Sequence, residues 1–238
     1  MRALRIGLIV LAVLALLAAV GDRVAVRLVQ AEAGDRIRQE YGLSESPEIR
    51  IKGFPFLTQV LDKRFEEVTV DLSGITADGA NGSDLTLARA DARLYDLRVQ
   101  GDRWDRATAA RAEGRVRFGY EDISRALPGG VVTVSYGGKD AAGDGLVKAT
   151  VGATFFGEKV ENSALVRISA EGGNTIRLQT VKIEGADVVP GLEELLRSRL
   201  DYEWKITDLP RGLRLGAVEI TEEGITVTGS GRDVELAP

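Results

Sequence analysis

The chain begins with an apolar run that continues into a helical pattern. Two arginines precede residues 6–21, which carry no charge, and Asp22 closes this run. After it, apolar residues recur four positions apart between charged ones, at Val29, Ala33, Ile37 and Tyr41. This spacing places them on one face of an α-helix. The pattern predicts a signal sequence or membrane anchor over residues 1–21 and an amphipathic helix over residues 22–42 that follows it directly.

Beyond Pro47 the apolar positions alternate with polar ones, a period of two that is typical of half-buried β-strands. The alternating runs are Val68/Val70/Leu72, Leu85/Leu87, Val116/Phe118/Tyr120, Val132/Val134, residues 146–156, residues 165–168, Ile176/Leu178, Val181/Ile183, Leu213/Leu215 and Ile225/Val227. Turns rich in Gly, Asn and Asp separate several of them, as hairpins require. The pattern predicts a meander of long antiparallel strands.

Two short helical segments interrupt the strands. Residues 121–127 end at the breaker cluster formed by residues 128–130, Pro-Gly-Gly, which cannot continue a helix. Residues 190–200 carry a stripe of leucines, with acids in the first turn and arginines in the last, as the helix dipole favours. No shift in composition marks a boundary between Pro47 and Pro238. We therefore expect the α+β class and a single domain over residues 22–238.

Three of the six phenylalanines fall between residues 49 and 70. An alternating strand breaks at Gly53 and Pro55, and Phe54 and Phe56 flank the proline. A short apolar turn follows with Leu57, Val60 and Leu61. This pattern indicates either a hydrophobic plug where a strand turns a corner or a grip on an apolar ligand.

Composition removes most catalytic chemistry. The 238 residues include no cysteine and no histidine, so disulfides, thiolate nucleophiles, imidazole bases and the usual zinc, copper and haem ligands are excluded. The net charge of −5 argues against a nucleic-acid partner. We find no nucleotide-binding or nucleophile-elbow motif, and we expect no cofactor, no metal and no catalytic residues.

The remaining charged motifs favour solvated surfaces. The glutamate pairs 66–67, 193–194 and 222–223 are adjacent in sequence, and adjacent residues on a strand point to opposite faces. Arginines at 103, 106, 111, 115 and 117 alternate with acids at 102, 105 and 113. This segment could meet an anionic lipid or glycan, but a solvated face of mixed charge is the stronger interpretation.

The N-terminal run is marginal for a membrane span. Its 16 residues fall short of the roughly 20 that a spanning helix needs. Ala19-Val20-Gly21 resembles a weak cleavage site. A cleaved secretion signal and a retained anchor are therefore both open, and either one exports the rest of the chain.

Two stretches of the chain resemble a known family. The first stretch reads Pro-Glu-Ile-Arg-Ile-Lys-Gly-Phe-Pro-Phe-Leu-Thr-Gln over residues 47–59 and Phe-Glu-Glu-Val-Thr-Val over residues 65–70. The second reads Leu-Pro-Arg-Gly-Leu-Arg-Leu over residues 209–215, followed by short runs at 218–220, 224–227 and 232–234. They resemble the LmeA-like family of actinobacterial cell-envelope phospholipid-binding proteins, formerly a domain of unknown function.

The resemblance implies a fold similar to the tubular lipid-binding proteins. In that fold a long, strongly curved antiparallel sheet is wrapped around an amphipathic helix, here with two short additional helices. It also implies phospholipid binding, of inositol phospholipids in the best-known relative, and a role in the maturation of mannosylated envelope glycolipids. It carries over no catalytic residues, and an envelope glycosyltransferase is a candidate partner.

The leading hypothesis is an exported or membrane-anchored monomer that binds or transfers phospholipid without catalysis. Acyl chains would lie in an apolar crevice between helix and sheet, lined by Val29, Ala33, Ile37, Phe54, Phe56, Leu57, Val60, Val68, Val70, Phe118 and Phe156. Proximity in sequence makes Lys52, Lys63 and Arg64 the candidates for the headgroup.

Two other functions stay open. A structural adaptor would dock another envelope protein through an exposed sheet edge and have a fully packed interior. A carboxylate-dependent hydrolase or transferase acting on glycolipid would need two acids converging in one cleft.

Overall fold

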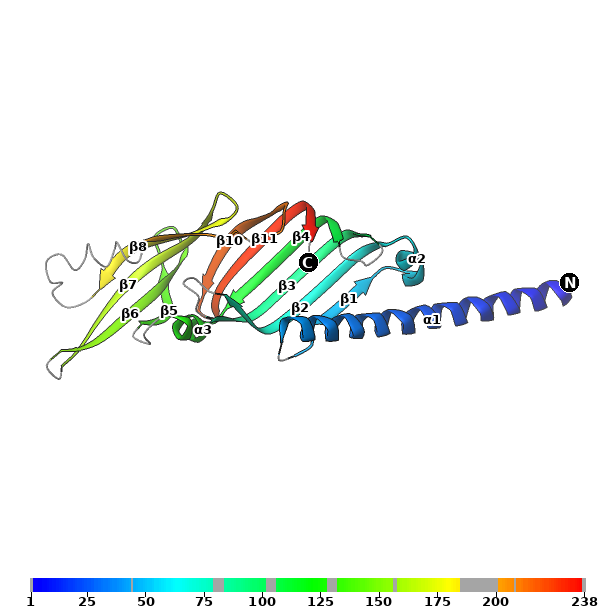
Figure 1. Cartoon of the computed structure of the whole chain (residues 1–238), viewed down its shortest axis with the longest axis horizontal. Coiled ribbons are helices and arrows are strands. Elements are labelled where there is room, and N and C mark those ends of the chain that lie inside the picture. The colour runs from blue at the N-terminus through cyan, green and yellow to red at the C-terminus, as the bar shows by residue number, and fades with distance from the viewer. Residues whose placement is uncertain are drawn as a thin grey trace.

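The computed structural model in Figure 1 describes residues 2–43, 45–78, 84–101, 106–127, 132–155, 158–184, 201–207 and 209–236. Its helices are α1 (Arg2–Tyr41), α2 (Phe56–Leu61) and α3 (Tyr120–Ala126). Long antiparallel strands make up most of the rest, which confirms the α+β class. The expected helix over residues 190–200 and the candidate Phe156 lie outside the described residues.

A six-stranded sheet forms the half of the molecule next to α1 (Figure 1). In spatial order it contains β1 (Glu48–Lys52), β2 (Arg64–Asp78), β3 (Asp84–Gln100), β4 (Arg106–Phe118), β11 (Gly224–Leu236) and β10 (Leu213–Thr221). All neighbours are antiparallel. The C-terminal hairpin therefore completes a sheet that the first half of the chain begins.

A five-stranded antiparallel sheet forms the far half (Figure 1). Its strands, in order, are β5 (Val132–Lys139), β6 (Gly145–Phe155), β7 (Glu158–Glu171), β8 (Thr175–Glu184) and β9 (Tyr202–Lys205). The strands predicted from alternation are thus divided between two sheets. β10 packs against β6 and β7, and α3 contacts both β3 and β5.

Backbone contacts hold the two sheets together. The Leu215 N–H donates to the Gly173 carbonyl at 2.7 Å. At Gly145, a side chain would collide with the carbonyl oxygen of Ile220, so only glycine lets β6 approach β10 this closely. Val134, Val147, Ile220 and Ile225 form a shared core cluster from both sheets.

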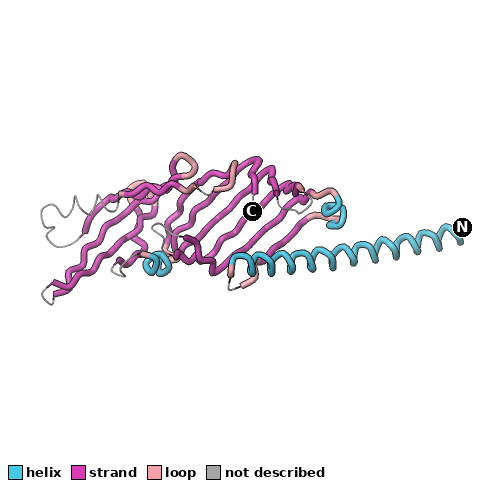
Figure 2. The backbone as a smooth tube through the Cα atoms, viewed as in Figure 1, coloured by secondary structure: helices cyan, strands magenta, loops and turns pink. Residues whose placement is uncertain are grey.

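The helix α1 is a single element of 40 residues, about 60 Å long at 1.5 Å per residue. Its C-terminal half packs on β1 and α2, and its N-terminal half projects past α2 (Figure 2). The apolar segment and the predicted amphipathic helix are therefore continuous. Val26 is buried against the sheet, with Ala33 and Ile37 packed beside it.

The central part of the six-stranded sheet has one polar and one apolar face. The register places Arg50, Thr69, Arg93 and Glu113 in one row across β1 to β4. The next row, on the other side of the sheet, contains Ile49, Val70, Ala92 and Gly114. Because side chains alternate along each strand, the adjoining rows differ in the same way, with Asp71, Asp91 and Arg115 on one side and Leu72, Ala90 and Val116 on the other. Nearer to α2 the row of Phe65, Leu97 and Ala109 is apolar instead, so the division holds for the central part of the sheet. We call these two surfaces the polar face and the apolar face.

Candidate functional site

The segment 53–61 forms a corner between β1 and β2, which we call the α2 corner. Gly53 has a φ of +97°, a conformation that favours glycine. A Cβ at Gly53 would also lie 2.6 Å from the Gln59 side-chain nitrogen. Position 53 therefore requires glycine for two reasons, which are its backbone conformation and the closeness of the Gln59 side chain.

Two buried polar side chains hold the α2 corner in place. The Gln59 amide donates to the Lys52 carbonyl at 3.2 Å and accepts from the Glu66 N–H at 2.9 Å. Asp22 of α1 is only 2% exposed. Its carboxylate accepts from the Leu57 N–H at 2.9 Å and from the Arg23 guanidinium at 2.7 Å. The corner is thus tied both to the sheet and to α1.

The two phenylalanines of the α2 corner have different environments. Phe56 is 2% exposed and belongs to the core with Val26 and Phe65. Phe54 is 60% exposed, and the Arg23 guanidinium lies 5.1 Å from the centre of its ring. Phe56 therefore anchors the corner, while Phe54 presents its ring to the outside.

Leu57 and Leu61 extend the exposed apolar surface of the α2 corner. They are 49% and 82% exposed. Val60 instead packs against the core cluster. Val24 and Leu28 on α1 are also exposed, as are the large apolar residues from Ile6 to Val20. Apolar surface therefore occurs on both the corner and the adjacent helix.

The other predicted tail-binding residues divide between core and surface. Val68 is buried, and Val70, Ala33 and Ile37 pack on the same cluster. Phe118 is half-buried at the end of β4. Val29 is exposed on α1, to one side of the stripe that contacts the sheet.

Further along the apolar face, small residues fill the central rows. Ala92 pairs with Gly114, and Gly114 pairs with Gly229. In the adjacent row Ala90 lies between Leu72 and Val116. These residues are half-buried wherever their exposure is described. This part of the apolar face thus offers accessible apolar surface with few large side chains.

The three headgroup candidates are all engaged by the protein itself. Lys63 donates to the Gly101 carbonyl at 3.1 Å. Arg64 holds Asp96 in a two-pronged contact of 2.5 and 3.0 Å, and this hydrogen bonding keeps the pKa of Asp96 below its usual range. Lys52 pairs with Glu67 at 2.6 Å. Of the three, Lys52 is the one that lines a cleft on the polar face.

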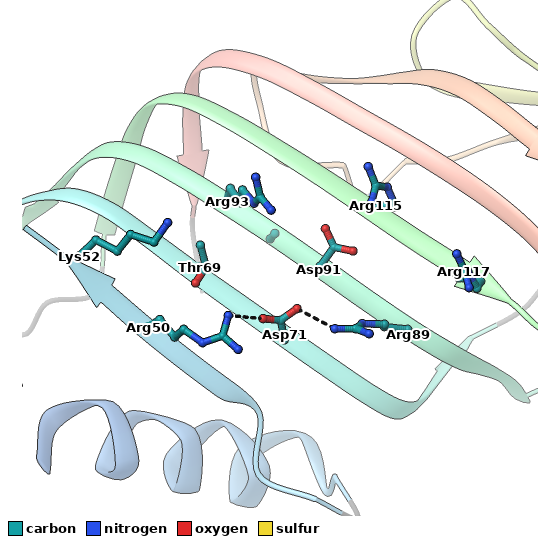
Figure 3. A pocket seen from close by; sticks show the side chains of 10 residues that line it. Arg50, Lys52, Thr69, Asp71, Arg89, Asp91, Arg93, Arg115 and Arg117 are labelled. Carbon is teal, nitrogen blue, oxygen red and sulfur yellow. Dashed lines mark hydrogen bonds and ion pairs between the residues drawn. The ribbon is translucent and has the colours of Figure 1, made fainter. Parts of the chain in front are cut away.

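That cleft has a volume of about 410 Å³, and we call it the basic cleft (Figure 3). Its lining is Arg50, Lys52, Thr69, Asp71, Arg89, Asp91, Ala92, Arg93, Arg115 and Arg117. Only Arg115 and Arg117 lie in the charged segment that the sequence singled out. Sequence analysis missed the cleft as a site because four strands contribute to it.

The described residues offer no arrangement for metal chemistry. Among them, no group of three or more Asp or Glu side chains could hold a metal ion. Glu67 and Glu223 are each paired with a basic side chain, at 2.6 and 3.0 Å. The third glutamate pair, 193–194, falls outside the described residues.

Within the described part of the chain, one helix is long and apolar enough to cross a membrane, over Arg5–Gln39. Its position next to the N-terminus also fits a signal sequence. No curated protein and no solved structure matches the chain. A family model described as LmeA-like phospholipid-binding matches residues 20–230, which include the five-stranded sheet and all of the six-stranded sheet except the end of β11. The chain therefore belongs to the LmeA-like phospholipid-binding family.

Proposed function

We propose that this protein is an exported, membrane-anchored carrier that binds phospholipid tails between α1, the α2 corner and the apolar face. Family membership is the observation that carries the proposal. The half-buried apolar face and the exposed apolar side chains of the α2 corner support it. The tail site would include Ala33, Ile37, Val70 and Phe118 at its margins.

The energetics of such a site favour tails with many methylene groups. Burial of each CH₂ group contributes about 0.8 kcal/mol, so a chain of ~14 such groups gains on the order of 10 kcal/mol before ordering costs. The apolar face needs no titratable group for this purpose. Lipid binding therefore suits a chain without histidine or cysteine.

The α2 corner would contact the bilayer where lipid enters. Arg23 of α1 touches this corner, through Gly53 and Phe54. The apolar run of α1 ends at Gly21, about 3 Å of helix rise earlier. If residues 6–21 lie in the bilayer, Phe54, Leu57 and Leu61 then lie at its interface.

We further propose a role in envelope glycolipid biogenesis. An exported carrier that delivers phospholipid would supply an envelope enzyme that uses it, and a glycosyltransferase is the candidate partner. Inositol phospholipid is the candidate ligand that the family resemblance favours. Lys52, the headgroup candidate that lines the basic cleft, lies on the polar face, opposite the proposed tail site, so a phosphate contact there would serve a second ligand.

Mass spectrometry of lipids extracted from the purified full chain tests the proposal. We expect phospholipid to co-purify and to be taken up from vesicles. The variant Ala90→Phe places a large ring on the half-buried apolar face, so it should lower the bound lipid several-fold. Ser73→Phe makes the same change at an exposed position of the polar face, paired with Arg89, and should retain it.

A chain that carries no lipid after purification and takes none up from vesicles would contradict the proposal. The same result would favour an adaptor with a packed interior. Equal loss of lipid in both phenylalanine variants would place the tails somewhere other than the apolar face.

A further inference from the structure

The basic cleft is a concentration of positive charge on a chain that is acidic as a whole. Six cationic and two acidic side chains line it, whereas the chain carries a net charge of −5. The cations come from β1, β3 and β4, and they point into the same cleft (Figure 3). The sheet therefore assembles a local positive field from residues up to 67 positions apart in the sequence.

The acids near the cleft neutralise only some of these cations. Asp71 pairs with Arg50 at 3.5 Å and with Arg89 at 3.4 Å. Lys52 and Arg117 find Glu67 and Glu223 beside the cleft. In the described part of the chain, Arg93 and Arg115 have no ion-pair partner.

The strand register also brings like charges together. Arg89 of β3 lies directly opposite Arg117 of β4, and like charges in that arrangement destabilise a sheet. An anion bound between them would attract both guanidinium groups and offset their mutual repulsion.

Thr69 provides an independent observation at the same place. It is 7% exposed and lines the cleft, in register between Arg50 and Arg93. Its hydroxyl is buried and finds no hydrogen-bond partner among the described residues. A buried polar group without a partner is costly and rare, so a ligand oxygen is a natural partner for it.

We propose that the basic cleft binds the phosphoryl group of a polar, sugar-sized ligand. Guanidinium groups match phosphate oxygens with paired hydrogen bonds, and Arg93 and Arg115 are the two that are available for this. The volume of about 410 Å³ admits a phosphate ester. The polar lining excludes an acyl chain as the occupant.

This site is on the opposite face of the sheet from the proposed tail site. Phosphoryl binding in the basic cleft and tail binding on the apolar face can therefore be tested separately, and the first does not depend on the second.

Calorimetric titration of the full chain in phosphatidylcholine nanodiscs tests the proposal, with inorganic phosphate and glycerol 3-phosphate as probes. We expect saturable binding that weakens with added salt. The double variant Arg93→Gln/Arg115→Gln should raise the Kd at least about tenfold, since it removes two charge-assisted contacts. Arg36→Gln removes an exposed arginine on α1 and should leave the Kd unchanged.

Two further variants distinguish a binding site from a merely charged surface. Asp91→Asn removes an acid from the cleft, so it should lower the Kd severalfold. Thr69→Val removes the unpartnered hydroxyl while keeping the shape of the side chain. It should raise the Kd severalfold and leave the stability equal or higher, because the hydroxyl has no partner in the free protein.

Phosphatidylglycerol added to the nanodiscs tests whether a lipid headgroup competes with glycerol 3-phosphate for the cleft. A several-fold higher apparent Kd for glycerol 3-phosphate would identify a lipid headgroup as the occupant. An unchanged Kd would identify a soluble or glycan-borne phosphate. Absence of saturable binding to the unmodified chain, or equal binding by the Arg93→Gln/Arg115→Gln variant, would overturn the proposal.

Discussion

Phe54 and Phe56 are two residues apart but have opposite environments, one exposed and one in the core. On a regular strand that spacing would put both rings on the same face. Here β1 ends at Lys52, Gly53 has a positive φ and the helix α2 begins at Phe56, so neither ring follows the strand period. The sequence predicted a corner rich in phenylalanine. It could not predict which ring is buried, because that depends on α1 packing against Phe56.

The conformation of the α2 corner depends on two hydrogen bonds made by the Gln59 side chain. Gln59→Leu leaves the Lys52 carbonyl and the Glu66 N–H without their partner. We expect the free energy of unfolding, measured by urea denaturation, to fall by about 2–4 kcal/mol. Thr58→Ala removes an exposed bond to the Pro55 carbonyl and should cost under about 1 kcal/mol. Similar losses for both variants would contradict the structural role of Gln59.

Tyr120 makes the stability of the fold depend on pH in alkaline solution. Burial, with the nearby Tyr136, raises its pKa from 10.0 to about 12, and its hydroxyl donates to the Thr221 carbonyl at 2.5 Å. Because the folded pKa is the higher one, the stabilisation is complete below pH 10 and is lost as pH rises toward about 12. Chemical denaturation across this range should show a steeper decline for the unmodified chain than for Tyr120→Phe. Parallel declines would contradict this.

At the scale of elements, periodicity predicted the type of most segments well. α1, α3 and the long strands occur where their apolar spacing placed them. The α2 helix was expected only as an apolar turn, since its six residues are too few to establish a period. The division into two sheets was not predictable either, because alternation gives the face of each residue but not its neighbouring strand.

The contact between α1 and the sheet depends on a glycine. A Cβ at Gly34 would lie 2.8 Å from the Pro47 carbonyl oxygen, whereas Gly21 has nothing within 4 Å. In a helix interior, alanine is more favourable than glycine by ~1 kcal/mol, and this holds at either position. We expect Gly34→Ala nevertheless to lower the urea midpoint and Gly21→Ala to keep or raise it. A higher midpoint for Gly34→Ala would show that α1 does not pack this closely.

At the scale of the whole molecule, the two faces of one sheet separate apolar from charged surface. The apolar face could be predicted from alternating Val, Leu and Ala residues, and the candidates Val68 and Val70 lie on it. The basic cleft could not, because Arg50, Arg89 and Arg115 come together only through the pairing of β1 to β4. For Arg115 and Arg117, the acids nearby in the sequence favoured the interpretation of a solvated surface of mixed charge.

The proposed entry point for lipid lies at one end of the six-stranded sheet. α1 projects from the end of the six-stranded sheet, and the α2 corner lies beside it (Figure 1). A lipid that enters at this corner reaches the apolar face without crossing the charged one. We therefore expect the acyl chains of a bound phospholipid to lie on the apolar face.

Photolabelling with a phospholipid that carries a diazirine in its acyl chain identifies the residues that contact the chain. The detergent-solubilised full chain is loaded with the lipid, irradiated and digested, and the labelled residues are identified by mass spectrometry. We predict labels on the apolar face around Val70, Ala90 and Phe118 and on Phe54 of the α2 corner. Labels confined to the polar face, or absent from both sheets, would contradict the account.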